Sequence, residues 1–230
     1  MRKNLVILLG LAIGILSTGV NNAQSVKIGD ESYETITAAV HAASWGDVID
    51  IRGKHTETIT LYKEVTLRGS DPSEDIIQAA EKPGKEGAGR VLFIKSAVTI
   101  ENLGIHNGSS GNNVGGGIFI NRWTKGTTNL KNLVVKNNES TKSAGGIGIQ
   151  GANVVIENCR ITKNQTTGFG GGLNILAKKP SNGEVTIKNS VIDHNKAGKN
   201  GGGIYATGQF GKENLISLNI ENTILAFNKT

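Results

Sequence analysis

The residues that first invite a chemical interpretation are glycines. The stretch NGGGIYATG, residues 200–208, places three glycines before an aliphatic residue, as a phosphate-binding loop can. A nucleotide-binding loop also needs Gly-Lys-Ser/Thr at its end. No such triplet follows this or any other glycine cluster in the chain, so we exclude a P-loop.

Other candidate groups do not gather in the sequence into a site. The four histidines, at positions 41, 55, 106 and 194, lack the spacing of metal ligands. The single cysteine, Cys159, excludes an internal disulfide. The chain has 25 Lys and Arg against 19 Asp and Glu, a mild excess that suits an acidic partner without demanding one. We therefore predict no cofactor, no metal site and no nucleic-acid partner.

The glycine clusters belong to a repeat, which recurs every 26 to 33 residues. GGGIFI, GGIGIQ, GGGLNI and GGGIYA alternate with a second phrase in which an aliphatic residue, Asn, a second aliphatic residue and a second Asn follow at fixed spacing. Periods of 20 to 50 residues are typical of solenoids. Short runs with apolar residues two apart indicate strands, and Asn and Gly suit the bends between them. The repeat therefore predicts rungs of three short strands, stacked on one another.

Stacking predicts columns of side chains. Three are aliphatic: Ile100, Leu130, Ile156, Ile187 and Ile220; Ile105, Val135, Ile161, Ile192 and Leu225; and Ile118, Ile147, Leu173 and Ile204. A charged outward column alternates in sign: Glu101, Lys131, Glu157, Lys188 and Glu221. The recurrent asparagines should form amide ladders, and Cys159 should be a small packing residue.

Leucine-rich repeats are the alternative solenoid, since they also carry an Asn ladder. Here the anchors are mainly Ile and Val, and no segment after Val98 has a helical pattern. These features favour a parallel β-helix. Length varies only between the glycine-bearing strand and the next rung, and such variable connections project from one face, often the binding face.

The N-terminal part differs from the repeats. Residues 1–23, with Arg2 and Lys3 before an apolar run, have the layout of a secretory signal peptide. We assign 24–97 to an N-terminal cap and first irregular coils, and 98–230 to the repeat coils of the β-helix, which we expect to be C-terminally incomplete. Ile36, Ala39, Val40 and Ala43 form one apolar face of a short helix, and Gly46-Asp47 ends it before an alternating strand. This helix should cover the open end of the solenoid.

Residues 35–53 resemble the cap that begins many exported right-handed parallel β-helix proteins of the pectate-lyase-like superfold. The GGGI and aliphatic-x-x-Asn phrases are similar to the repeats of the polymorphic outer membrane protein group, although Gly replaces Ala and Ile, Val or Leu replaces Phe. The resemblance covers most of residues 33–230. It implies an all-β, right-handed parallel β-helix with a short N-terminal capping helix, secreted or held at the cell surface or outer membrane.

The resemblance also implies that a polysaccharide-processing site must be sought. Hydrolysis needs two carboxylates facing one groove, and the expected outward residues of the glycine-bearing strands, Phe119, Gly148, Asn174 and Tyr205, include none. VIDHN, residues 191–195, resembles a pectate lyase phrase, yet Asp193 and His194 occupy ordinary repeat positions. We therefore predict no catalytic residues.

Aromatic and basic residues on the variable edge remain, and they could hold an acidic polysaccharide or a cell-surface glycan. The candidate binding residues are Phe119, Arg122, Trp123, Lys178, Lys179 and Tyr205; the alternative is an ordinary solvated face. We expect an exported, non-catalytic surface protein, adhesin-like or glycan-binding, with self-association at its open last rung. The alternative function is a polysaccharide lyase of the superfamily or a truncated relative.

Overall fold

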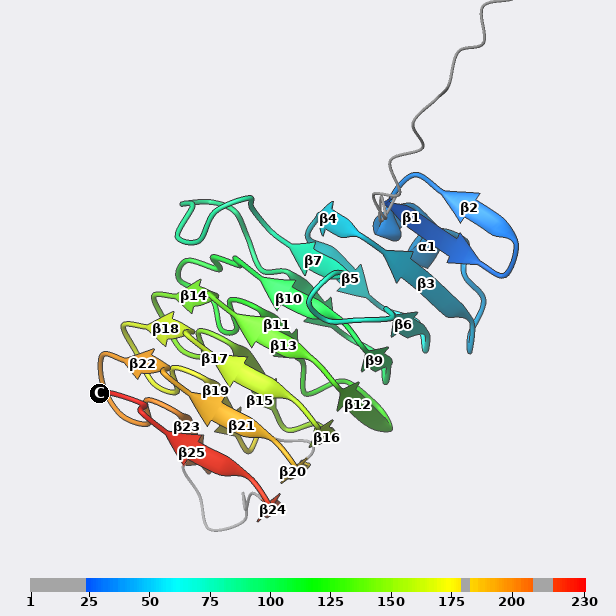
Figure 1. Ribbon diagram of the computed structural model, residues 1–230. Helices are drawn as coiled ribbons and strands as arrows, with labels where there is room; N and C mark the ends of the chain where they lie inside the picture. Colours follow the sequence, from blue (N-terminus) through cyan, green and yellow to red (C-terminus); the bar gives the residue numbers. More distant parts are fainter. Residues whose placement is uncertain (1–23, 179–182, 209–216) are drawn as a thin grey trace, which may run out of the picture.

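The computed structural model describes residues 24–178, 183–208 and 217–230 of the chain. Within them the chain winds through stacked rungs of short strands, with the N-terminal cap at one end and the C-terminus at the other (Figure 1). The fold is the predicted right-handed parallel β-helix. The expected signal peptide, residues 1–23, lies outside the described residues.

In the described parts of the chain, sheets A, B and C run along the helix axis with one strand from each rung, and a fourth sheet, D, is confined to three rungs. Sheet A contains, in spatial order, β2 (Glu31–Tyr33), β1 (Ser25–Ile28), β3 (Val48–Arg52), β6 (Thr66–Arg68), β9 (Thr99–Glu101), β12 (Thr127–Lys131), β16 (Asn153–Glu157), β20 (Glu184–Lys188) and β24 (Ser217–Glu221). Sheet B contains β4 (Lys54–Thr56), β7 (Ile76–Gln78), β10 (Gly104–His106), β13 (Val134–Lys136), β17 (Arg160–Thr162), β21 (Val191–Asp193) and β25 (Ile224–Ala226). Sheet C contains β5 (Ile59–Leu61), β8 (Leu92–Ile94), β11 (Ile118–Ile120), β15 (Ile147–Gln150), β19 (Leu173–Leu176) and β23 (Ile204–Thr207). Sheet D contains only β14 (Glu139–Ser140), β18 (Gln165–Thr166) and β22 (Lys196–Ala197).

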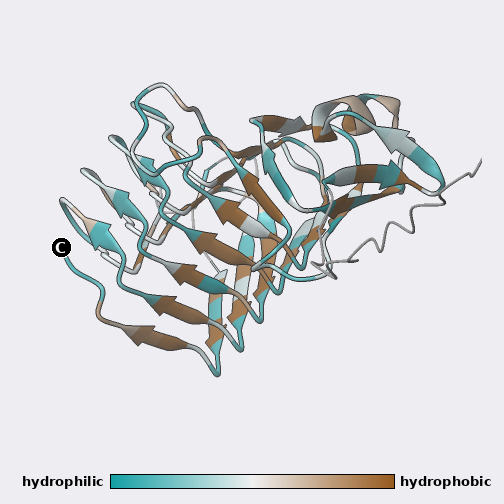
Figure 2. Ribbon diagram, turned by 45° about the horizontal axis from the view of Figure 1, so that its top comes forward, coloured by the Kyte–Doolittle hydropathy of each residue, from teal (hydrophilic) through white to brown (hydrophobic). Residues whose placement is uncertain are grey.

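The predicted aliphatic columns are confirmed by the strand register. Leu130 pairs with Ile100 on one side and with Ile156 on the other. The inward side chains of sheets A, B and C fill the interior, and Leu130, Val135 and Ile156 are completely buried. Figure 2 shows hydrophobic residues recurring from strand to strand along the stack, while the short strands of sheet D are mainly hydrophilic. Each buried aliphatic side chain contributes about 1.5–3 kcal/mol through removal from water.

The bend between sheets A and B is built by a single asparagine in each repeat. These residues adopt a left-handed backbone conformation, with φ between 43° and 56°: Asn102, Asn132, Asn158, Asn189 and Asn222. Asn tolerates this conformation better than other non-glycine residues. The first Asn column of the repeat therefore does what the sequence predicted.

The N-terminal cap consists of α1 (Ile36–Ala42) and the β1–β2 hairpin. Thr35 caps the helix, since its hydroxyl accepts a hydrogen bond from the Ala38 amide at 3.0 Å. Ile36, Ala39 and Val40 are buried, as the helical spacing predicted. The hairpin was not predicted; β1 pairs antiparallel with β3 and so protects the edge of sheet A.

The outer column of sheet A alternates in charge, as predicted. Glu157 and Lys188 form an ion pair with 3.1 Å between Oε1 and Nζ. The column extends into the first rungs, where Arg68 lies in register with Glu101 and binds Asp50 through two hydrogen bonds of 2.8 and 2.9 Å. Opposite charges on facing strands favour this register.

Candidate functional site

The connection from sheet B to sheet C extends away from the interior that sheets A, B and C enclose, and it forms a lobe. We use this name for residues 107–117, 137–146, 163–172 and 194–203, which include sheet D. The sequence analysis predicted three strands per rung and missed this fourth element.

A buried ladder of asparagines holds the base of the lobe. In the middle of it, the side-chain amide of Asn164 donates to Val135 O and to Asn195 Oδ1, both at 3.0 Å. Its Oδ1 accepts from the amide and the side chain of Asn138, at 3.1 and 3.0 Å. All the hydrogen-bonding capacity of this buried side chain is used. The predicted amide ladder is therefore confirmed for the second Asn column.

The second Asn column does not itself make the bend, and this corrects the sequence analysis. The left-handed residue is the one before the ladder Asn, with φ of 54° to 57°: Asn107, Asn137, Lys163, His194 and Phe227. The ladder position is selected for side-chain hydrogen bonds and the preceding position for backbone conformation. The sequence-based prediction gave both roles to the ladder Asn, whereas the structure divides them between two neighbouring residues.

The glycine clusters close the lobe, and they answer the question that the sequence raised. Gly170 has φ of 70°. A Cβ on Gly145 would lie 2.4 Å from Gln165 O, and one on Gly146 would lie 3.1 Å from the Asn164 side chain. Glycine is therefore needed because the returning backbone packs directly against the next rung and its Asn ladder.

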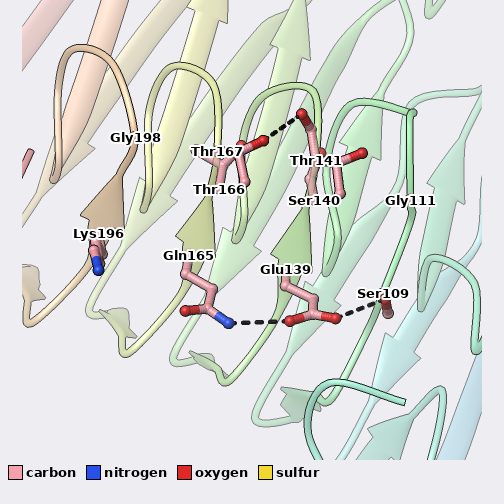
Figure 3. Close-up of a pocket in the computed structure, with 10 residues that line it drawn as sticks. All are labelled: Ser109, Gly111, Glu139, Ser140, Thr141, Gln165, Thr166, Thr167, Lys196 and Gly198. Atoms are coloured by element: carbon pink, nitrogen blue, oxygen red, sulfur yellow. Dashed lines mark hydrogen bonds between the residues drawn. The ribbon is translucent and has the colours of Figure 1, made fainter. Parts of the chain in front are cut away.

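A groove of about 530 Å³ runs along the outside of the lobe (Figure 3). We call it the lobe groove; its lining residues are Ser109, Gly111, Glu139, Ser140, Thr141, Gln165, Thr166, Thr167, Lys196 and Gly198. Most of these side chains carry a hydroxyl, amide or charged group. Because they come from equivalent positions of successive rungs, they repeat at roughly 4.8 Å along the axis.

Hydrogen bonds within the groove fix the orientation of its side chains. The Ser109 hydroxyl donates to Glu139 Oε1 at 2.9 Å, and Gln165 Nε2 donates to Glu139 Oε2 at 3.0 Å. Figure 3 shows these three residues in one row that continues to Lys196. On the other side, the Thr167 hydroxyl donates to Thr141 O at 2.6 Å. Such an arrangement presents an ordered series of donors and acceptors to a ligand lying along the axis.

The structure separates the predicted binding residues instead of gathering them. Phe119 is only 9% exposed, because the guanidinium of Arg90 lies 4.8 Å from its ring centre and covers it. Burial lowers the pKa of Arg90 to about 10. Tyr205, in the same outward column, is half-buried and stacks on Phe169 with 4.7 Å between ring centres. The lobe covers this face of sheet C, which the strand pattern alone did not indicate.

The remaining predicted residues follow strands of sheet C on the far side from the lobe. Trp123 is 60% exposed, and the Arg122 guanidinium lies 4.7 Å from the centre of its ring. Lys178 is half-buried on the same edge, after β19, whereas Trp123 follows β11. Lys179 lies outside the described residues. The glycan role of these six residues stays a prediction.

Cys159 and Asp193, the two other groups considered from the sequence, are both buried in the structure. Cys159 is 3% exposed, and burial raises the pKa of its thiol to about 12. Asp193 accepts a hydrogen bond from Arg160 Nη2 at 2.7 Å and contacts His194 Nδ1 at 3.1 Å. Burial alone would raise the pKa of Asp193, but these contacts lower it to about 2. The carboxylate therefore stays ionised and engaged on sheet B.

The groove is lined mainly by hydroxyl and amide groups, with one carboxylate and one ammonium group. Glu139 is the one carboxylate among its lining residues, and glycoside hydrolysis uses two. Within the described ranges, no group of three or more His, Cys, Asp or Glu is placed to hold a metal ion. In the same part of the chain, no helix is long and apolar enough to cross a membrane.

The sequence does contain a signal for the lobe groove. The three residues that follow each position of the second Asn column are mostly polar: Ser109-Ser110-Gly111, Glu139-Ser140-Thr141, Gln165-Thr166-Thr167 and Lys196-Ala197-Gly198. Read as a column, this run is a hydroxyl-rich strip. The strip was not predicted because a strand of two residues is too short to show an alternating pattern.

Comparisons with known proteins do not assign this chain to a family. No family model matches the chain, and no curated protein matches it. Among solved structures it is similar to a pectin methylesterase variant crystallised with a hexasaccharide, at 12% identity and a TM-score of 0.41, covering 86% of this chain and 78% of that one. A likeness of this degree does not bear on activity, so the function must be argued from the site.

Proposed function

We propose that this protein is an exported, non-catalytic surface protein that binds a glycan chain along the lobe groove. The observation that carries the proposal is the repetition of polar groove residues from rung to rung, fixed by hydrogen bonds to one another. A polysaccharide presents hydroxyl groups at a regular spacing, and a stack of rungs presents donors and acceptors at a regular spacing. The similarity of the repeats to those of the polymorphic outer membrane protein group supports a location at the cell surface.

The experiment is retention of residues 24–230 on immobilised polysaccharides, followed by measurement of the dissociation constant for a retained oligosaccharide. Glu139→Gln with Gln165→Leu should weaken binding about tenfold, since it removes hydrogen bonds to a charged group and to an amide. Glu157→Gln makes the same change on the outer face of sheet A and should leave binding unchanged.

A second pair of changes tests the alternative surface that the sequence predicted. Trp123→Ala with Lys178→Ala should leave binding intact if the lobe groove holds the glycan. Loss of binding in this variant, with no loss in the groove variant, would transfer the site to the far edge of sheet C. Retention of no polysaccharide at all would contradict the proposed function.

A polysaccharide lyase remains the alternative function, and it has a direct assay. The purified chain is incubated with pectate, alginate and chondroitin, with and without calcium, while the ultraviolet absorbance of unsaturated products is followed. We expect a flat trace beside an active control lyase. A calcium-dependent rise would overturn the non-catalytic proposal.

Self-association at the last described rung is part of the proposal. Ile220 and Leu225 are 41% and 48% exposed there, whereas their register partners Ile187 and Ile192 in the preceding rung are completely buried. Exposed strands with apolar side chains favour pairing with another chain. Light scattering should detect oligomers of residues 24–230, and a clean monomer would count against this part.

A further inference from the structure

A second cavity, of about 300 Å³, adjoins the lobe groove and differs from it in charge. We call it the basic pocket. Its lining residues are Lys163, His194, Lys196, Phe227 and Lys229, together with the amides Asn164, Gln165 and Asn195. No carboxylate lines it. Because it shares Gln165 and Lys196 with the groove, a chain in the groove would reach it.

Two lysines of the pocket face each other across neighbouring rungs. Lys196 forms a parallel bridge with Lys229, so their side chains leave the backbone roughly 4.8 Å apart. Like charges directly opposite each other are destabilising. The outer column of sheet A avoids this by alternating sign, as between Glu157 and Lys188. An anion between Lys196 and Lys229 would remove the repulsion.

The left-handed positions that line the basic pocket are occupied by residues that are larger than the bend requires. Lys163, His194 and Phe227 have φ of 54° each, at the position that Asn107 and Asn137 occupy in earlier rungs. Asn is better suited than Lys or Phe to this left-handed conformation. Backbone strain that a simpler residue would relieve is typical of functional sites. All three of these residues line the basic pocket.

The two carboxylates that contact pocket residues, Asp193 and Glu139, are held by hydrogen bonds. Asp193 is bound to Arg160 at 2.7 Å and to His194 at 3.1 Å. Glu139 accepts hydrogen bonds from Ser109 and Gln165. Among the described residues, none of Lys163, Lys196 and Lys229 forms an ion pair. The basic pocket is therefore lined by three lysines that have no ion-pair partner among the described residues.

We propose that the basic pocket binds a tetrahedral oxyanion, a sulfate or phosphate group, carried on a sugar. Lysine ammonium groups bind phosphate as point charges, so several of them can approach a tetrahedral group from different sides without the fixed geometry of an arginine fork. No arginine lines the pocket. The exposed ring of Phe227, 73% accessible and 5.1 Å from the ring centre of His194, offers an apolar surface to the sugar itself.

The first test uses inorganic sulfate and does not depend on glycan binding. Residues 24–230 are titrated with sodium sulfate at constant ionic strength, with chloride as the replaced anion, while amide chemical shifts are followed by NMR. Sulfate should shift the amides of residues 163–165 and 194–196 and chloride should not. Lys196→Gln and Lys229→Gln should each weaken sulfate binding about fivefold.

A matched control removes one lysine charge elsewhere. Lys188→Gln, on the outer face of sheet A, should leave sulfate binding unchanged, and an equal loss there would overturn the proposal. Lys229→Glu should abolish sulfate binding and raise the urea midpoint in the absence of sulfate, because it replaces repulsion by attraction. A lowered midpoint, or sulfate binding that survives this change, would contradict the proposal.

The second test compares sulfated, phosphorylated, carboxylated and unsubstituted forms of one oligosaccharide. The sulfated or phosphorylated form should bind at least tenfold more tightly than the others, and Lys196→Gln should reduce this preference. Equal binding of all four forms, or preference for the carboxylated one, would overturn the proposal. Sulfate binding without any binding of unsubstituted glycan would contradict the lobe groove as a glycan site and leave the anion site standing.

Discussion

The two bends that flank sheet B have the same backbone conformation but different residues. At the bend before the sheet, the left-handed position is Asn in every repeat, from Asn102 to Asn222. At the bend after it, Asn107 and Asn137 give way to Lys163, His194 and Phe227. Since the conformation is shared, the difference cannot come from the requirements of the turn. It coincides with the cavities: the first bend lines neither the lobe groove nor the basic pocket, and the changed residues of the second line the pocket.

Stability and binding are therefore separated within a few residues of the second bend. Asn138, Asn164 and Asn195, each of which follows a left-handed residue, are buried in the ladder and hold the base of the lobe. The left-handed residue itself is free to vary, and it does so toward the C-terminal rungs. Substitutions of the ladder Asn and of the left-handed residue should therefore change the free energy of unfolding by different amounts and even with different signs.

The largest effect should come from the ladder. Asn164→Leu leaves the partners of Asn164 in the buried ladder without their hydrogen bonds, so it should lower the free energy of unfolding by about 4 kcal/mol. The same substitution at exposed Asn158, where only the left-handed backbone is strained, should cost about 1–2 kcal/mol. Urea unfolding of both variants measures the contrast, and equal costs would contradict the distinction between the bends.

His106, just before the second bend, should make stability depend on pH. Burial first, and the charges of Lys136 and Lys54 second, lower its pKa from 6.5 to about 3. Between these values the unfolded chain binds a proton that the folded chain does not. Stability is therefore complete above pH 6.5 and is lost as pH falls, by about 2–3 kcal/mol between pH 7 and pH 4.5.

His106→Gln should remove this dependence, since Gln78 occupies the same column one rung earlier. His41→Gln, at an exposed position of α1, serves as the control and should leave the pH profile as it is. A profile that His106→Gln does not flatten would mean that other groups titrate in this range.

The smallest effect should have the opposite sign. Lys163→Asn places the residue of Asn107 and Asn137 in the same left-handed position, so it should raise the free energy of unfolding by about 0.5 kcal/mol. The reverse change, Asn137→Lys, should lower it by a similar amount. Thermal unfolding measures both, and a loss of stability in Lys163→Asn would show that Lys163 is selected for folding and not for the pocket.

Much of the architecture could be predicted because it depends on periodic residues. The aliphatic columns, the alternating charges of sheet A and the cap helix each follow from side chains spaced at strand or helix period. The lobe could not be predicted in the same way. Strands such as Gln165–Thr166 contain two residues, which is too few for a period to appear.

The site was harder to predict than the fold for a related reason. Phe119 was expected to face solvent because its strand alternates, and it does point outward. Its burial depends on Arg90, which belongs to another rung and a longer connection. Contacts of this kind between connections leave no spacing in the sequence. The Asn ladder could be predicted from the sequence. The finding that the left-handed residue is the one before the ladder Asn required the backbone dihedral angles.

The measurement that tests the central claim most directly is a map of amide and Asn side-chain chemical shifts during titration with a retained oligosaccharide. The account predicts that shifts concentrate on the lobe, at residues 109–111, 139–141, 165–167 and 196–198, while Asn102, Asn132, Asn158 and Asn189 of the first bend stay unchanged. Shifts centred on Trp123 and Lys178, or on the first bend, would contradict the claim that the second bend and its lobe form the binding surface.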